Sequence, residues 1–162
     1  MKNHRREPSA LPPSLDDLGT ESALELVYML LSLAWGGGSG VIRGATDHDL
    51  KVVPMYPAAG MGVRVMPGYA FISKFPFKLA DVVLMPAIPA PAKQPRLDLV
   101  QVRLADWSIS VKQGTEADHP MVPEVDKDCL ALARIYLRPS MICIKDSDDS
   151  INGYIIDVRS FL

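Results

Sequence analysis

The sequence is poor in the residue types that carry most catalytic and metal chemistry. Its three histidines, His4, His48 and His119, are isolated, and none has a cysteine or second histidine at the spacing of a zinc site. No nucleophile elbow, Walker loop or dinucleotide-binding fingerprint is present. The glycine-rich stretch 36–40 follows a predicted helix rather than a strand, which indicates a hinge. We therefore expect no catalytic residue, metal or cofactor.

A strong charge of one sign and a long apolar run are also absent. The formal net charge is −2, so no basic field favours a nucleic-acid partner. The longest apolar stretch, 26–34, has about nine residues, whereas a membrane span needs about twenty. Acidic residues between the basic first six residues and this stretch argue against a secretion signal. We expect neither a nucleic-acid nor a membrane partner.

Cysteine and aromatic residues are few. Cys129 and Cys143 both lie in apolar, strand-like runs, where small buried thiols are common. We predict that both are free and buried, as in a protein assembled in a reducing cytoplasm. Hydrophobic residues nevertheless make up 48% of the 162 residues, which is enough for the core of one domain with an appendage.

The first forty residues divide into an arm and a helix. Residues 1–19 are polar and contain three prolines, which predicts an extended arm that is ordered where it lies on a partner, or otherwise a floppy terminus. Residues 20–35 have the pattern of a helix that Thr20 caps. Three glycines from Gly36 end it. We assign 20–40 to an oligomerisation helix with its hinge.

This predicted helix is apolar over most of its circumference. Only four of its side chains are clearly suited to water, so it needs cover on more than one side. The β domain can supply one cover, and copies of the helix around a symmetry axis can supply another, which favours a homotrimer. The alternative is a helix that packs only on its own domain. The candidate oligomer interface consists of Leu24, Val27, Tyr28, Leu31 and Trp35.

Residues 41–162 have the pattern of a β domain. Short runs of β-branched and aromatic residues alternate with polar ones, and most of the fourteen prolines fall between these runs. The predicted fold is mainly β: a small antiparallel β-sandwich or barrel with one N-terminal helix and an extended N-terminal arm. The predicted strands are 41–43, 50–53, 62–65, 69–72, 81–84, 97–104, 107–111, 130–137, 141–144 and 154–159.

An acidic cluster covers residues 146–153. Asn152-Gly153 between two apolar runs predicts a hairpin turn. The spacing of Asp146, Asp148, Ser150 and Asn152, with Asp157 further on, permits a weak calcium loop as the alternative, although the position that needs glycine holds Ile151.

Five motifs in residues 40–160 occur in the order found in a known structural module. They are Pro67-Gly68-Tyr69-Ala70-Phe71-Ile72, the strand 96–103, the turn at Gly114-Thr115 with spaced prolines, the strand 130–135, and Ile155-Ile156-Asp157-Val158-Arg159. This part of the chain resembles a β-rich connector module of tailed-phage tail, baseplate and fibre-base proteins. The segment 73–95 departs from the pattern.

The resemblance implies a non-enzymatic virion protein, a connector or adaptor that joins a fibre or spike to the tail, baseplate or capsid. Its partners would be copies of itself and other phage virion proteins, and its location the virion. The alternative is a receptor- or carbohydrate-binding module with exposed aromatic residues in 73–95 or 116–126. Within the module, Asp98 interrupts an apolar strand and needs a cation if buried. We predict an ion pair with Arg159, with Arg96 as the other partner considered; the remaining alternative is that Asp98 faces solvent.

Overall fold

The computed structural model describes residue 27 and residues 38–162 except 45 and 74, and this described part of 38–162 is mainly β without a helix. Eleven strands follow one another along it and form three sheets, in which all pairings but one between strands are antiparallel. The strands are β1 (Gly40–Ile42), β2 (Val52–Pro54), β3 (Val63–Val65), β4 (Gly68–Ile72), β5 (Phe75–Leu79), β6 (Val83–Leu84), β7 (Arg96–Arg103), β8 (Ile109–Lys112), β9 (Cys129–Leu137), β10 (Ile144–Lys145) and β11 (Gly153–Asp157).

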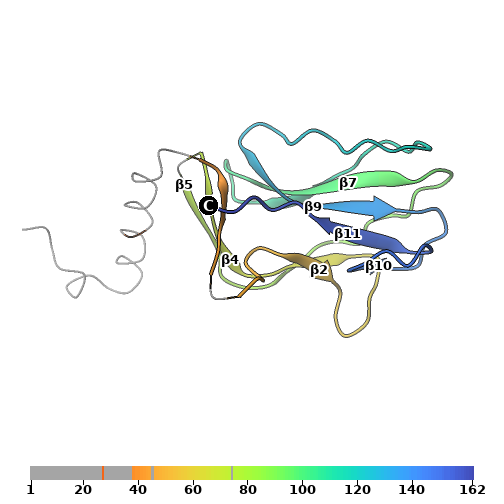
Figure 1. Ribbon diagram of the computed structural model, residues 1–162, viewed down its shortest axis with the longest axis horizontal. Coiled ribbons are helices and arrows are strands. Elements are labelled where there is room, and N and C mark those ends of the chain that lie inside the picture. The colour runs from red at the N-terminus through yellow and green to blue at the C-terminus, as the bar shows by residue number, and fades with distance from the viewer. Residues whose placement is uncertain (1–26, 28–37, 45, 74) are drawn as a thin grey trace, which may run out of the picture.

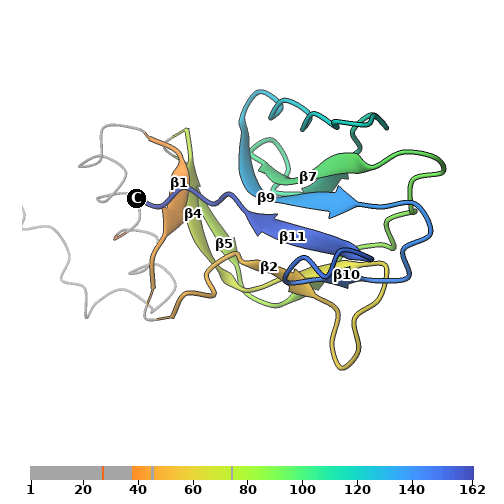
Figure 2. The same cartoon turned by 45° about the vertical axis from the view of Figure 1, so that its right-hand side comes forward.

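The largest sheet has five strands in the order β10-β11-β9-β7-β8. The two other sheets have three strands each, in the orders β1-β4-β5 and β2-β3-β6. Figures 1 and 2 show the β1-β4-β5 sheet across one end of the molecule, from which the five-stranded sheet extends to the opposite end. The chain therefore has two distinct ends.

One hydrophobic core joins the three sheets. The long strands β7 and β9 pair from Arg96↔Leu137 to Arg103↔Cys129, with a bulge at Val100/Gln101. Because side chains alternate along a strand, one face of this pair supplies fully buried residues such as Val100, Ile135 and Leu137. The other two sheets contribute Val41, Val63 and Ile72, each at most 1% exposed. Burial on this scale is the main stabilising contribution.

The C-terminal residues cover the end of the molecule that carries the β1-β4-β5 sheet. Val41 donates its N–H to Ser160 O, and Leu162 donates its N–H to Val41 O, so the last residues run along β1. Gly40, the last residue of the predicted hinge 36–40, is therefore a strand residue. A Cβ at Gly40 would lie 2.8 Å from the Leu162 side chain, so the close approach of the C-terminus favours glycine here.

The predicted Asn152-Gly153 hairpin is wrong. β10 and β11 run parallel, with Ile144 opposite Gly153, and Gly153 donates its N–H to Cys143 O. The reason lies in the Asp149 carboxylate, which accepts the backbone N–H groups of Ile151 and Asn152 and folds 146–152 into a compact loop. A local side-chain-to-backbone arrangement thus replaces the two-residue turn.

Candidate functional site

Asp98 forms a buried ion pair with Arg96. Arg96 Nε lies 2.7 Å from Asp98 Oδ1 and Arg96 Nη2 lies 3.0 Å from Oδ2, with the two side chains 3% and 1% exposed. Gly114 also donates its N–H to Asp98 Oδ1, and Arg96 Nη2 donates to Pro89 O. The pair thus joins three segments, since β7, the loop before it and the turn after β8 all contact it. Asp98 does not face solvent.

The expected pair between Asp98 and Arg159 is not formed. Residues at positions i and i+2 of a strand project from the same face, so Arg96 reaches Asp98 along β7 itself. Arg159 follows β11 and instead pairs with Asp157, with Nη2 2.6 Å from Oδ2 and Nε 2.9 Å from Oδ1. Each of the two arginines thus pairs with the aspartate two residues away from it.

Arg159 fastens the C-terminal segment to the loop before β2. Its guanidinium donates to the carbonyl groups of Asp47 and Asp49 and lies 4.9 Å from the centre of the Phe161 ring. The Arg159 side chain is 1% exposed, whereas that of Asp157 is 43% exposed. The hydrogen bond from Arg159 is the main reason why the pKa of Asp157 is lowered.

The lowered pKa of Asp157 predicts an acid-sensitive contribution to stability. An aspartate whose pKa is lower in the folded state contributes fully above its unfolded pKa, near 3.8, and the contribution is lost as the pH falls through the folded pKa. We expect Asp157→Asn to lower stability at pH 7 and to reduce the loss of stability between pH 5 and pH 2. Urea unfolding at several pH values measures this, with the exposed Asp118→Asn as control. Equal pH profiles for the wild type and Asp157→Asn would contradict it.

The loop between β8 and β9 lies over the outer face of the five-stranded sheet. Gln101 and Asp126 exchange two hydrogen bonds, and Lys112 contacts Asp126 as well. At the start of the loop, Glu116 accepts the backbone N–H groups of residues 92, 93 and 94 at 2.8, 3.0 and 3.2 Å. These bonds, that from Ala92 foremost, lower the pKa of Glu116. The loop is fixed at both ends.

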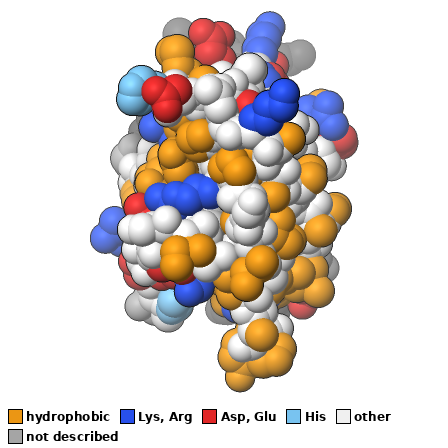
Figure 3. Space-filling view, turned by 90° about the vertical axis from the view of Figure 1, so that its right-hand side faces the viewer, with side chains coloured by type: hydrophobic (Ala, Val, Ile, Leu, Met, Phe, Trp, Pro, Cys, Tyr) orange, Lys and Arg blue, Asp and Glu red, His pale blue; other side chains and the backbone are white. Residues whose placement is uncertain are grey.

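The end of the molecule away from β1 presents apolar side chains on four loops. β7 begins and β9 ends here, and Ile144 donates its N–H to Gly60 O, which brings the β2–β3 loop alongside. Figure 3 shows this end, with hydrophobic side chains spread over it and gathered on a projecting loop. We call it the loop-end surface and define it by four side chains that are 70–84% exposed: Tyr56, Met121, Ile142 and Ile151.

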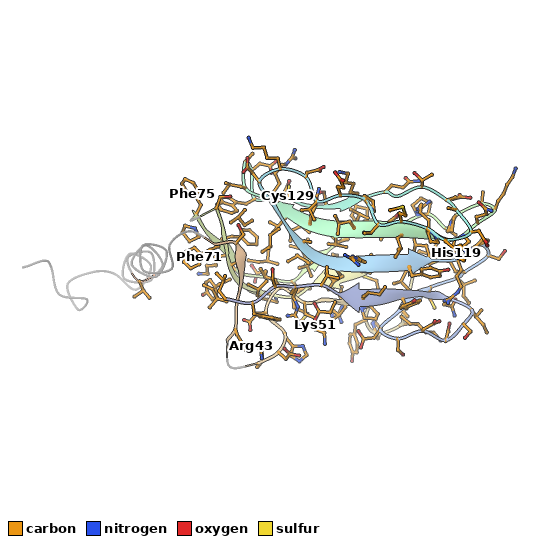
Figure 4. The ribbon with its side chains drawn as sticks, turned by 45° about the horizontal axis from the view of Figure 1, so that its top comes forward. Arg43, Lys51, Phe71, Phe75, His119 and Cys129 are labelled. Carbon is orange, nitrogen blue, oxygen red and sulfur yellow. The ribbon has the colours of Figure 1, made fainter. Side chains whose placement is uncertain are left out.

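The side chains at opposite ends can be followed in Figure 4. Phe71 and Phe75 mark the end that carries β1 and β5, and His119 marks the loop end. Phe71 is buried, whereas Phe75 is 58% exposed. The two ends therefore differ in structure. One carries the β1-β4-β5 sheet, which the chain enters at Gly38, and the other consists of loops.

No family model matches the chain. Comparison with the curated proteins found no match. Comparison with the solved structures likewise found none. The functional assignment must therefore be argued from the geometry and from the motifs.

The acidic cluster 146–153 is occupied by contacts within the protein. Asp149 binds Lys145 and the Asn152 side chain, which together with two backbone N–H groups lower its pKa. Asp148 binds Arg138, and Asp157 binds Arg159, so two of the three aspartates considered for calcium pair with cations of the chain. Within the described residues no group of three or more histidine, cysteine or acidic side chains is placed to hold a metal ion.

The structure describes both cysteines, but only one of the five residues of the predicted oligomer interface. Cys143 is buried and Cys129 half-buried, both are free, and burial raises the pKa of the Cys129 thiol. Trp107 stacks on Phe77 with ring centres 5.2 Å apart. Of the predicted oligomer interface only Val27 is described, with helical backbone and a 38% exposed side chain; Leu24, Tyr28, Leu31 and Trp35 lie outside the described residues. No helix among the described residues has the length and apolar character to cross a membrane.

Proposed function

We propose that the chain is a non-enzymatic assembly subunit, and that the assembly is a tailed-phage particle in which it connects a fibre or spike to the tail, baseplate or capsid. The observation that carries the proposal is the two-ended arrangement. The chain enters the β domain at Gly38, beside β1, while the loop-end surface lies at the opposite end. A subunit that joins two components needs two separate contact regions.

The loop-end surface has the character of a contact region. Isolated exposed apolar residues are common on proteins, but a group of large ones from four loops is typical of an interaction site. Next to this surface lies Arg64 of β3, whose guanidinium is 5.6 Å from the centre of the Tyr56 ring. Arginine and tyrosine are enriched at protein interfaces. This supports docking of another protein at the loop end.

The motifs that resemble phage connector modules support a structural role for this chain. Asp98, Gly114 and Arg159 belong to three of these motifs, and each makes contacts that hold segments of the fold together. The proposed particle type comes from the motif resemblance, and the proposed assembly role from the geometry.

The test concerns the N-terminal helix that the proposal places near a threefold axis. We expect Leu31→Asp to convert the oligomer to monomer or aggregate, because it places a charge in an apolar interface. The matched control is Ser32→Asp, one position along, where the helix pattern predicts a wettable side chain. Light scattering gives the mass of each variant. If Leu31→Asp left the mass of the wild type unchanged, the helix would not form the interface.

A further inference from the structure

An apolar groove separates the edges of two sheets. β8 is the last strand of the five-stranded sheet, and β6 is the last strand of the β2-β3-β6 sheet. The groove lies between β8 and the segment that follows β6, with Met85, Pro86, Ile88 and Pro89 on one side and Ile109 and Val111 on the other. Ile109 and Val111 pack against the core yet are only half-buried, so the groove leaves part of the core open.

The backbone of β8 offers hydrogen-bonding groups to this groove. Arg103 donates its N–H to Ser108 O at 2.9 Å, which marks these two as a hydrogen-bonded pair of the β7–β8 ladder. Such pairs alternate along antiparallel strands, so Ser110 and Lys112 direct their backbone groups toward β7. Ile109 and Val111 direct theirs away from β7. Among the described residues they have no backbone partner on that side.

Among the described residues, the opposite wall forms no backbone hydrogen bond with Ile109 or Val111. Met85 and Ile88 donate their N–H groups to Val63 O and Met61 O, and the two prolines have no N–H to donate. An unpaired strand edge beside half-covered core residues is complementary to one more extended segment, which would pair with β8 and cover the apolar side chains.

We propose that residues 7–12 of the N-terminal arm occupy this groove as an added strand beside β8. Residues 13–37 link the proposed strand to Gly38, and even with 20–35 helical this link reaches up to about 50 Å, several times the length of β8. Charge favours the same placement. Residues 1–6 contain Lys2, Arg5 and Arg6 and no acidic residue, whereas the loop 116–128, which follows β8 and the groove residue Gln113, contains five acidic residues and one lysine.

The prolines of the arm fit an edge strand. Pro8 and Pro12 are four residues apart, so both can face away from β8 while Glu7, Ser9 and Leu11 direct their N–H groups toward it. Pro13 falls at a position that would face β8, and it ends the pairing. Prolines on the outer side also prevent further strands from adding to the new edge.

Amide hydrogen exchange of the full chain tests the proposal at single residues. The amides of Ile109 and Val111 are expected to exchange slowly in the wild type, because the arm covers them. Ser9→Pro removes an inward N–H and should speed the exchange of both by about tenfold or more. Ala10→Pro is the matched control, since its proline faces away and should leave the exchange unchanged. The amides of Ser110 and Lys112, directed toward β7, should stay slow throughout.

Two results would overturn the proposal: fast exchange at Ile109 and Val111 in the wild type, or equal effects of Ser9→Pro and Ala10→Pro. Repeating the exchange at decreasing concentration identifies the copy that supplies the arm. If exchange at Ile109 and Val111 stays slow in the monomer, the arm belongs to the same subunit as the groove. If the slow exchange is lost when the oligomer dissociates, the arm comes from a neighbouring copy. A monomer with slow exchange would contradict the proposed assembly role alone, and an oligomer with fast exchange the groove proposal alone.

Discussion

Asp98→Ala is expected to destabilise the protein by about 3 to 5 kcal/mol, because it leaves Arg96 buried without its counter-charge. Arg96 is 3% exposed and would keep only Pro89 O as a hydrogen-bond acceptor. The N–H of Gly114 would lose its acceptor as well. Removing one partner of a buried pair costs far more than removing both, since the remaining charge has no water to replace the lost contact. Urea unfolding of the wild type and the variant measures the difference in free energy.

The matched control for Asp98→Ala is Asp106→Ala. Asp106 also binds an arginine of β7, Arg103, through both carboxylate oxygens, but the two side chains are about half exposed. Water replaces the lost contact there, so a much smaller change is expected. If the two substitutions had the same effect on the free energy of unfolding, the Arg96–Asp98 pair would not be buried as described.

Gly114→Ala is expected to destabilise the protein by about 3 kcal/mol through a steric conflict. A Cβ at this position would lie 2.0 Å from Leu97 O and 3.1 Å from the Leu97 carbonyl carbon, both backbone atoms that cannot swing aside. Relief requires the turn after β8 to move away from β7, which also lengthens the hydrogen bond from Gly114 to Asp98. Thermal or urea unfolding measures the effect.

Gly60→Ala is the control for Gly114→Ala, because a Cβ at Gly60 would meet no atom within 4 Å. We expect a change within about 1 kcal/mol there. A Gly114→Ala protein as stable as Gly60→Ala would show that the turn does not approach Leu97 so closely. Because Asp98 and Gly114 share a hydrogen bond, their combined substitution is expected to cost less than the two single effects added together.

Strand positions were predictable from the sequence because apolar and polar residues alternate along most of them. Segments such as 69–72, 97–104 and 130–137 overlap β4, β7 and β9. The missed strand is β5, Phe75–Leu79, where Pro76 argues against a strand. β5 is the edge of its sheet, so it tolerates a residue without an N–H. Whether a strand is an edge depends on tertiary arrangement, which local pattern does not contain.

The buried ion pair was partly predictable. A carboxylate in an apolar strand indicates a buried cation partner, and the chain contains both Arg-Leu-Asp at 96–98 and Asp-Val-Arg at 157–159. Strand geometry puts residues two apart on one face, and this rule selects Arg96 for Asp98. Arg159 lies just beyond β11, and it pairs with Asp157 at the same two-residue spacing. The contacts of Arg159 with Asp47 O and Asp49 O join residues 110 or more apart, and no local pattern indicates them.

The loop-end surface could not have been found from sequence. Tyr56, Met121, Ile142 and Ile151 lie on four different loops, and each is an ordinary apolar residue in its own segment. They come together because β7, β9 and β11 meet at one end and because Ile144 binds Gly60 across two sheets. The parallel pairing of β10 with β11 could not be predicted either. It depends on hydrogen bonds to the Asp149 side chain, which turn propensities do not include.

The mass of the unmodified full chain in solution tests the assembly role most directly. Light scattering at micromolar concentration should give about three times the 17.7 kDa of one chain, because the apolar N-terminal helix needs neighbouring copies to cover it. A stable mass of one chain over the whole concentration range would contradict the account.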